Sequence, residues 1–289
     1  MKSPRALKLL RDISSTQVRP YKAMASDSPV HFFDITSTLP GSSKSWSPNT
    51  LKTRMVLNYK RIPYTQSWVS YPDIAPLLTS LAVPPNPDGI RYTLPAINHK
   101  QTVKSNPTGT LTDSFPIACH LEQHYPTPSL FPSGDASYAL TIAVQKLMSS
   151  AVGKARPLIV PNVANILDDK GREYFIETRS TSFGKPLSEV RPRDPERVKE
   201  ATDEIKKEME VLAQMLRGRQ EKTGPFFEGD KPGYADFIVV SFLAWVERAD
   251  KELWRELLDA GQGEFKALWE ASIPWVEGQG EEKDWPVAK

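Results

Sequence analysis

The sequence contains little cysteine, few histidines and almost no excess of charge of either sign. Cys119 is its single cysteine, so an intramolecular disulfide is impossible and a cysteine-rich zinc site is excluded. Lysine and arginine total 37 against 35 acidic residues, and a net charge of +2 gives no electrostatic reason to expect nucleic-acid binding. No apolar run approaches the ~20 residues of a membrane-spanning helix, so we expect no membrane span.

The overall composition indicates a globular protein. Hydrophobic residues make up 39% and charged residues 25% of the 289 positions, which argues against wholesale disorder. At roughly 100–200 residues per domain, this length allows one large domain or two ordinary ones. The 26 prolines predict many short connections and few long uninterrupted helices.

The first 25 residues differ in composition from the rest of the chain. They hold six basic residues against one acid, Asp12, and several serines. A basic, acid-poor and serine-containing start is typical of a mitochondrial transit peptide. A disordered basic tail and an upstream start before Met24 are the alternatives. We predict a basic N-terminal extension over residues 1–28, in a cytoplasmic or, alternatively, a mitochondrial protein.

The next hundred or so residues alternate between strand and helix signals. Aromatic and β-branched residues predict strands over Val30–Ile35 and Tyr64–Val69. Ser47 before Pro48 predicts a helix start, with serine as N-cap and proline at the first helical position. The remaining predicted elements are short strands over 93–97 and 101–103, a turn at 98–100, and a helix from Asp113-Ser114 to about residue 125.

Helical periodicity dominates after Pro132. Ile205, Met209, Leu212 and Leu216 form one apolar stripe on a long polar helix, and residues 236–246 are apolar enough for a buried helix. Further helices are predicted over 142–152, 250–258 and 264–271, with a loop over 181–195. We therefore expect a small mixed α/β domain over residues 29–132 and an all-α domain over residues 133–289.

Ser47 is the first candidate for chemistry. A helix N-terminus carries unpaired N–H groups and about half a positive charge, which stabilise an anion such as a thiolate. The serine hydroxyl can donate a hydrogen bond to that anion. The alternative is an ordinary serine N-cap without chemistry.

Two further motifs lie at the start of predicted elements. Leu94-Pro95 begins a strand, and a cis peptide there would expose the backbone of Leu94 to an extended ligand, whereas a trans proline in a turn is the alternative. Asp113 and Ser114 begin a helix, where the hydroxyl and backbone N–H can hold a carboxylate and the aspartate can pair with an ammonium. Simple helix capping is the alternative for this pair.

In order and spacing, these three features resemble the glutathione transferase family. The runs Ile117–Pro126 and Gly233–Asp236 also resemble sequences of this family. More narrowly, the run Ser47–Arg54, followed by Leu57–Lys60, is similar to fungal glutathione transferases related to bacterial β-etherases. The resemblance extends from Val30 to about Trp275 and implies a thioredoxin-like N-terminal domain followed by a helical one.

The resemblance implies glutathione as co-substrate and a role for each candidate residue. Ser47 would stabilise the thiolate, with Asn49 as a second donor. The Leu94 backbone, next to cis-Pro95, would pair with the cysteine amide of glutathione. The residues implied for the two ends of the peptide are Asp113 and Ser114 at the γ-glutamyl end and Lys100 at the glycine carboxylate. For Lys100, which falls in the predicted turn beside the site, an ordinary surface turn residue is the alternative.

The implied reaction is attack of the thiolate on an apolar or aromatic electrophile or ether, in a homodimeric detoxification enzyme. Serine at the catalytic position favours conjugation or ether cleavage over disulfide exchange, which needs a protein thiol. The alternative is a carrier that holds hydrophobic or aromatic ligands without turnover.

Four other positions receive structural predictions. Gly233 replaces the Ser or Thr that caps the buried helix in many members, so we expect an incomplete capping box. Cys119 is expected to be a small buried hydrophobe. His120 and His124 are expected on a solvated polar face, and no metal site is predicted.

Overall fold

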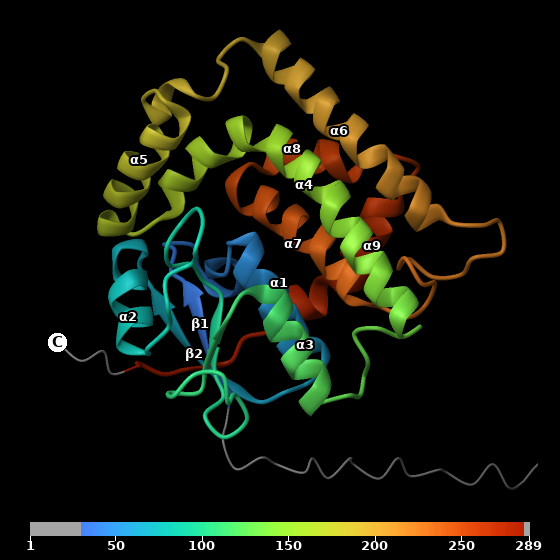
Figure 1. The fold of residues 1–289 in the computed structure, drawn as a ribbon. Coiled ribbons are helices and arrows are strands. Elements are labelled where there is room, and N and C mark those ends of the chain that lie inside the picture. Colours follow the sequence, from blue (N-terminus) through green and yellow to red (C-terminus); the bar gives the residue numbers. More distant parts are fainter. Residues whose placement is uncertain (1–29, 286–289) are drawn as a thin grey trace, which may run out of the picture.

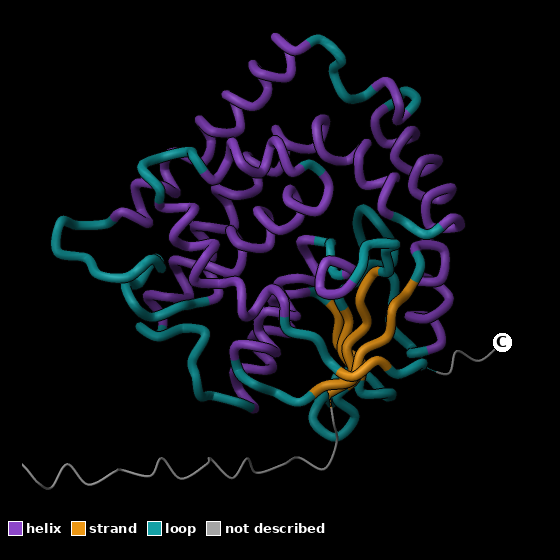
Figure 2. Tube along the Cα trace, turned by 180° about the vertical axis from the view of Figure 1, so that it is seen from behind, coloured by secondary structure: helices purple, strands orange, loops and turns teal. Residues whose placement is uncertain are grey.

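The computed structural model describes residues 30–285, so the predicted N-terminal extension lies outside the described residues. A five-stranded sheet of order β4-β3-β1-β2-β5 forms one corner of the molecule, and helices make up the rest (Figures 1 and 2). The strands are β1 (Val30–Ile35), β2 (Tyr64–Val69), β3 (Ala96–Asn98), β4 (Thr110–Thr112) and β5 (Glu281–Glu282). The predicted thioredoxin-like sheet domain followed by a helical domain is confirmed, and the boundary between residues 132 and 133 stays a prediction.

The central strand β1 is buried along its whole length, because helices and neighbouring strands cover it on every side. It pairs in parallel with β2 and antiparallel with β3. The helices of the sheet domain are α1 (Pro48–Tyr59), α2 (Ile74–Ser80) and α3 (Ser114–His124). The carboxyl ends of β1 and β2 lie at one edge of the sheet, and the chain leaves β1 there to reach α1.

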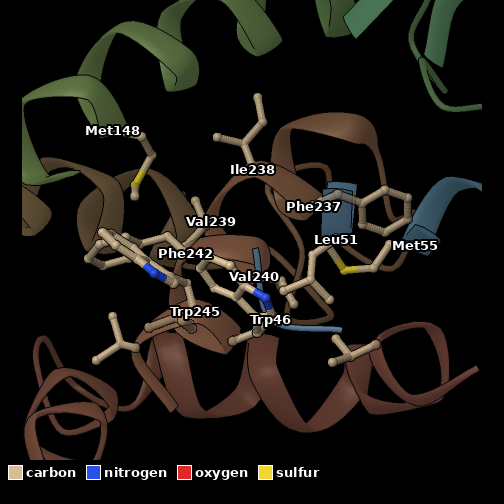
Figure 3. Close-up of a cluster of buried hydrophobic side chains, with 14 of the residues drawn as sticks. Trp46, Leu51, Met55, Met148, Phe237, Ile238, Val239, Val240, Phe242 and Trp245 are labelled. Carbon is tan, nitrogen blue, oxygen red and sulfur yellow. The ribbon is translucent and has the colours of Figure 1, made fainter. Parts of the chain in front are cut away.

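The second half of the chain is a helical bundle around one apolar helix. Its helices are α4 (Asp135–Val163), α5 (Asp169–Phe183), α6 (Pro195–Arg217), α7 (Tyr234–Ala249), α8 (Lys251–Leu258) and α9 (Glu264–Glu277). The predicted burial of α7 is confirmed, since its side chains from Tyr234 to Val246 are all buried. Leu51 and Met55 of α1 lie beside Phe237 of α7, so one core joins the sheet domain to the bundle (Figure 3).

The start of α7 is held without a capping side chain at residue 233. The Asp236 carboxylate accepts hydrogen bonds from the N–H of Gly233 (2.8 Å) and of Phe227 (2.9 Å). Burial raises the pKa of Asp236 to about 7, although both backbone donors act in the opposite direction. The acidic half of the capping box is therefore present, as the sequence predicts, and the half that needs a side chain at residue 233 is missing.

Two sequence predictions about secondary structure are wrong, one about the position of a strand and one about the length of a helix. The strand predicted over 101–103 is a turn, closed by hydrogen bonds from the N–H of Thr102 and Val103 to the His99 carbonyl, and its place in the sheet belongs to β4. The helix predicted over 142–152 is the middle of α4, which continues through Pro157 and Pro161. Burial of Leu158 and Ile159 in the core outweighs the local cost of these prolines.

The remaining boundaries differ less. The predicted loop over 181–195 contains the end of α5 and a 3-10 turn over Leu187–Glu189, and α9 extends beyond residue 271 to Glu277. Within the described residues 30–285, no helix is long and apolar enough to cross a bilayer.

Candidate active site

Ser47 occupies the N-cap of α1, at the edge of the sheet where β1 ends. Its backbone is extended, and its carbonyl accepts hydrogen bonds from the Leu51 N–H (2.9 Å) and the Thr50 hydroxyl (3.2 Å). The Ser47 side chain is 5% exposed and makes no capping hydrogen bond to the first turn of the helix. Its hydroxyl is therefore available to a ligand rather than used as an ordinary cap.

The first turn of α1 leaves backbone donors unused. Pro48 has no N–H, and within residues 30–285 the N–H groups of Asn49 and Thr50 have no hydrogen-bond acceptor. Asn49 is exposed at this end of the helix. Free donors and the helix dipole together give the position beside Ser47 a partial positive charge that favours a bound anion.

Leu94 and Pro95 lie beside the carboxyl end of β1. The antiparallel register places Ala96 opposite Phe33, near the end of β1. Leu94 and Pro95 come just before Ala96, so they lie at the end of β1 from which the chain continues to Ser47. The Leu94-Pro95 peptide is cis, as one of the two sequence alternatives has it. No hydrogen bond within residues 30–285 uses the Leu94 N–H or carbonyl, so both are open to an extended peptide.

Asp113 and Ser114 complete the same edge. Thr112 pairs with Ala96, and the Asp113 N–H donates to the Pro95 carbonyl at 3.3 Å. Asp113 is exposed and has a φ of 75°, whereas Ser114 is 8% exposed at the first position of α3. The structure thus brings Pro95, Asp113 and Ser114 together.

The base of this site is formed by the first residue of α7. Burial raises the pKa of the Tyr234 hydroxyl, and the Ser114 hydroxyl beside it acts in the opposite direction. The Tyr234 ring also lies 5.5 Å from the ring of Phe115. The helical domain therefore supports the start of α3 directly.

Lys52 is a site residue that sequence reasoning missed. It lies on α1, and burial lowers the pKa of its ammonium to about 8, while attraction to Asp113 acts in the opposite direction. The ammonium of this partly buried lysine is therefore close enough to Asp113 to feel its charge, without forming an ion pair with it. No local pattern marks Lys52 in the sequence, because its environment includes Asp113 on another helix.

Lys100 is not brought together with the other candidates. It follows His99 at the far end of β3 from Pro95, because β3 runs antiparallel to β1 and carries the chain to the opposite edge of the sheet. Its side chain is exposed there. Lys100 was expected in a turn beside the site. The structure places it in a turn away from the other candidates, as an exposed surface residue.

The histidines of α3 belong to a cluster with a third histidine. His99 is fully buried, with its Nδ1 3.0 Å from Nε2 of His120, and the ring of His120 lies 4.5 Å from that of His124. The predicted solvated face therefore holds for the exposed His124 and is wrong for His120, which is partly buried. Cys119 is half-buried, and burial raises the pKa of its thiol. Among residues 30–285, no group of three His, Cys, Asp or Glu side chains is arranged to hold a metal ion.

Aromatic side chains border the site on the side of the helical domain. The connection between α4 and α5 closes over the carboxyl edge of the sheet, where the Ser70 hydroxyl donates to Asp168 at 2.7 Å. Tyr71 lies 6.2 Å from Trp46 and stacks on Tyr174 at 6.2 Å, with the rings 16° from parallel. Tyr174 is 39% exposed and Trp46 only 3%, so Tyr174 is the ring of this group that mainly faces solvent.

A hollow lies elsewhere in the molecule. It has a volume of about 680 Å³ and lies among α4, α6 and α8, around the Arg191–Asp250 ion pair. None of its lining residues belongs to the candidate site.

Comparison with known proteins matches both halves of the chain to one family. The family model of the glutathione S-transferase N-terminal domain matches residues 46–124, and that of the C-terminal domain matches residues 139–275. The glutathione S-transferase-like protein ustS of Aspergillus flavus is 62% identical over 264 residues, which cover 90% of this chain and 96% of that protein.

Solved structures of fungal proteins have the same architecture. A glutathione S-transferase of Ceriporiopsis subvermispora, solved in complex with glutathione, is 31% identical with a TM-score of 0.74. Glutathione transferase GSTFuA3 of Phanerochaete chrysosporium is 28% identical, also with a TM-score of 0.74. Each match covers 86% of this chain and 97% of the solved chain.

Proposed function

The chain belongs to the glutathione S-transferase family, and we propose that it binds glutathione and activates its thiol for attack on an apolar or aromatic electrophile. The main support is that three groups without hydrogen-bond partners in the described residues lie at one end of the sheet. They are the Ser47 hydroxyl, the N–H groups of Asn49 and Thr50, and the N–H and carbonyl of Leu94. These groups are donors and acceptors of the kind that an extended peptide with a thiolate requires.

Glutathione lies across this edge in the proposed complex. Its cysteine residue pairs with the Leu94 N–H and carbonyl, and its γ-glutamyl end meets Asp113 and Ser114. Asp113 pairs with the ligand ammonium, while Ser114 and the start of α3 bind the ligand carboxylate. Lys52 replaces Lys100 as the cation of the site, because Lys52 lies within electrostatic reach of Asp113, whereas Lys100 lies beyond the other end of β3.

Ser47 and the first turn of α1 lower the pKa of the bound thiol. A shift of about two pKa units corresponds to about 2.7 kcal/mol. A helix N-terminus and one or two hydrogen bonds to a charged acceptor supply that amount. The thiol proton leaves to solvent, the sulfur forms a bond to the electrophilic carbon, and the leaving group departs with the electrons of the broken bond.

The second substrate is apolar or aromatic in this proposal. Tyr71 and the exposed Tyr174 form a stacked pair on the side of the helical domain, and flat rings bind aromatic ligands by stacking. Conjugation and ether cleavage both start from the same thiolate. Detoxification in a cytoplasmic homodimer stays a prediction, as does the etherase-like subtype.

The competing proposal is a carrier that holds glutathione and an aromatic ligand without turnover. A carrier would use the same binding site. It would differ in the pKa of the bound glutathione thiol, since a carrier does not need an ionised sulfur. Serine at position 47 is compatible with both, whereas its unused hydroxyl favours the catalytic proposal.

The experiment is a pH titration of thiolate absorbance for glutathione bound to the wild type and to Ser47→Ala. We expect the thiol pKa to lie about two units below that of free glutathione in the wild type and to rise in the variant, with turnover falling about tenfold for a loss of about 1.4 kcal/mol. Ser43→Ala, in the same loop, is the matched control. Identical curves for wild type and Ser47→Ala contradict the role of Ser47, and a thiol that titrates like free glutathione in the wild type favours the carrier.

A further inference from the structure

The chain beyond α9 returns to the sheet domain as a strap, defined here as residues 278–285 (Figure 1). Glu281 and Glu282 pair in parallel with Thr65 and Gln66 and so form the edge strand β5. The Lys283 N–H donates to the Gln66 carbonyl at 2.9 Å. The strap therefore covers the outer edge of β2, which would otherwise expose unpaired backbone groups.

Arg54 lies where the strap crosses α1. This arginine is fully buried, and its Nη2 donates to the Asp34 carboxylate at 2.8 Å. On its other side, Nη1 donates to Gln66 Oε1 at 2.7 Å and to Gln279 Oε1 of the strap at 3.0 Å. Because a buried guanidinium requires acceptors along its whole planar fork, the strap supplies part of the environment of this charge.

The same guanidinium holds the segment that leads into Ser47. Arg54 Nε donates to the Ser45 hydroxyl at 2.9 Å, and that hydroxyl donates to Asp34 at 2.7 Å. Ser45, Trp46 and Ser47 are all buried, with exposed fractions of 0%, 3% and 5%. A displacement of the guanidinium therefore moves a tightly packed segment only two residues from the Ser47 hydroxyl.

Gln66 closes the network on the strap side. Its Nε2 donates to Gln279 Oε1 at 3.2 Å, and its Oε1 accepts from the Gly280 N–H at 3.2 Å as well as from Arg54. Gln279 is thus the strap side chain that contacts Arg54, and it is otherwise exposed to solvent. Truncating it removes one acceptor from the guanidinium and leaves no buried cavity.

We propose that Gln279 and Arg54 are positioning residues for Ser47, so that the C-terminal strap forms part of the thiol-activating apparatus. The inference rests on the proposed function, since it concerns the thiolate that Ser47 would stabilise. The chain of contacts runs from Gln279 to Arg54, from Arg54 to Ser45, and along the backbone to Ser47. It involves no residue of the γ-glutamyl site.

Gln279→Ala tests the inference, with Glu282→Ala as the matched control. Glu282 also belongs to the strap and accepts a hydrogen bond from Trp68 Nε1 at 2.7 Å, but makes no contact with Arg54. Glu282 also lies 3.9 Å from Lys44 Nζ. Each variant removes a side-chain acceptor from the strap and leaves its backbone pairing with β2 in place. Gln279→Glu keeps an acceptor oxygen for Arg54 and is the rescue variant.

The measurements are the thiol pKa of bound glutathione and the separate kcat and KM values against pH. In Gln279→Ala we expect the thiol pKa to rise by about half a unit, which lowers the thiolate fraction and kcat about threefold below that pKa. KM for glutathione should be unchanged, and kcat should recover at high pH. Glu282→Ala and Gln279→Glu should keep the wild-type thiol pKa.

The outcomes separate this inference from the proposed function. If the wild type lowers the thiol pKa and Gln279→Ala lowers it equally, the strap is only a structural clasp and the inference is wrong. If Glu282→Ala raises the thiol pKa as much as Gln279→Ala does, strap attachment in general and not the Arg54 contact is responsible, which also overturns it. A wild type without any effect on the thiol overturns the proposed function and this inference with it.

Discussion

The Lys52 ammonium of α1 lies within electrostatic reach of the Asp113 carboxylate at the start of α3. Burial lowers the pKa of the lysine to about 8, and the aspartate partly offsets this effect. The ammonium is therefore close to its titration range at physiological pH, unlike an exposed lysine. A ligand that brings carboxylates to this site adds negative charge near the ammonium, beyond that of Asp113.

The first prediction concerns the pH dependence of glutathione binding. Lys52 loses its positive charge as the pH rises through about 8, so we expect glutathione affinity to fall in that range. Lys52→Arg, which stays charged, should keep its affinity to higher pH. Lys52→Met should bind about tenfold more weakly at pH 7, because a charged hydrogen-bonding partner contributes roughly 1.5–3 kcal/mol.

Calorimetric titrations between pH 6.5 and 9 would measure this dependence. Lys146→Met, on the exposed surface of α4, changes the net charge equally and serves as the control. Affinity profiles of Lys52→Arg and wild type that fall in parallel would assign the pH dependence to the ligand itself and remove Lys52 from the site.

The elements that sequence analysis located are those with a complete local signal. The strand Val30–Ile35 has a continuous run of aromatic and β-branched residues, and α7 has a continuous apolar run. In contrast, β4 has three residues and owes its extended form to pairing with β3, which no local pattern reports. Pro157 and Pro161 signal a helix end locally, and burial in the core overrides that signal in α4.

The candidate site follows the same division. Ser47, Leu94-Pro95 and Asp113-Ser114 lie at element boundaries, where capping and turn chemistry is visible in the sequence. Lys52 is a candidate because its side chain is partly buried near Asp113 of another helix. This proximity depends on the tertiary structure and is not visible in the local sequence. Lys100 was misplaced because a turn next to a strand can lie at either edge of a sheet, and only the antiparallel register decides which.

The second prediction concerns a conflict between stability and binding at Asp113. This residue has a φ of 75° and a ψ of 127°, a conformation that glycine adopts at a lower steric cost than residues with a Cβ atom. Asp113→Gly should therefore raise the free energy of unfolding by roughly 1 kcal/mol, since such strain costs about 1–3 kcal/mol and glycine gives part of it back in unfolded-state entropy.

The same substitution should weaken glutathione binding. It removes the proposed partner of the ligand ammonium, and we expect a loss of at least about 1 kcal/mol in affinity. Urea unfolding and calorimetry measure the two effects separately, and Asp113→Asn, which keeps Cβ, is the comparison variant. If Asp113→Gly is less stable than the wild type, the backbone at Asp113 is not strained. If it binds glutathione as tightly as the wild type, Asp113 does not contact the ligand ammonium.

Buried histidines form a second feature with a pH consequence. Burial is the largest cause that lowers the pKa of His31, His99 and His120, from 6.5 to about 4 in each. His31 lies between the hydroxyls of Thr65 (2.7 Å) and Ser67 (2.8 Å). A histidine of this kind binds a proton more readily in the unfolded chain than in the folded one.

The third prediction is a loss of stability in acid. Because the folded pKa lies below the unfolded one, the free energy of unfolding should fall as the pH drops from about 6.5 to about 4, by roughly 2 kcal/mol for a single such histidine. His31→Gln keeps partners for both hydroxyls and cannot take up the proton. It should be less stable than the wild type at pH 7.5, because it loses the ring contact of His31 with Trp285 at 4.6 Å.

Urea unfolding of both proteins at several pH values between 4 and 8 measures the slope. The wild-type curve should fall more steeply below pH 6.5 than the His31→Gln curve, so that the difference in stability narrows toward pH 4. His124→Gln replaces an exposed histidine and should leave the slope closer to that of the wild type. If the wild-type and His31→Gln curves run parallel over the whole range, proton uptake by His31 makes no contribution, and the acid sensitivity must come from other groups.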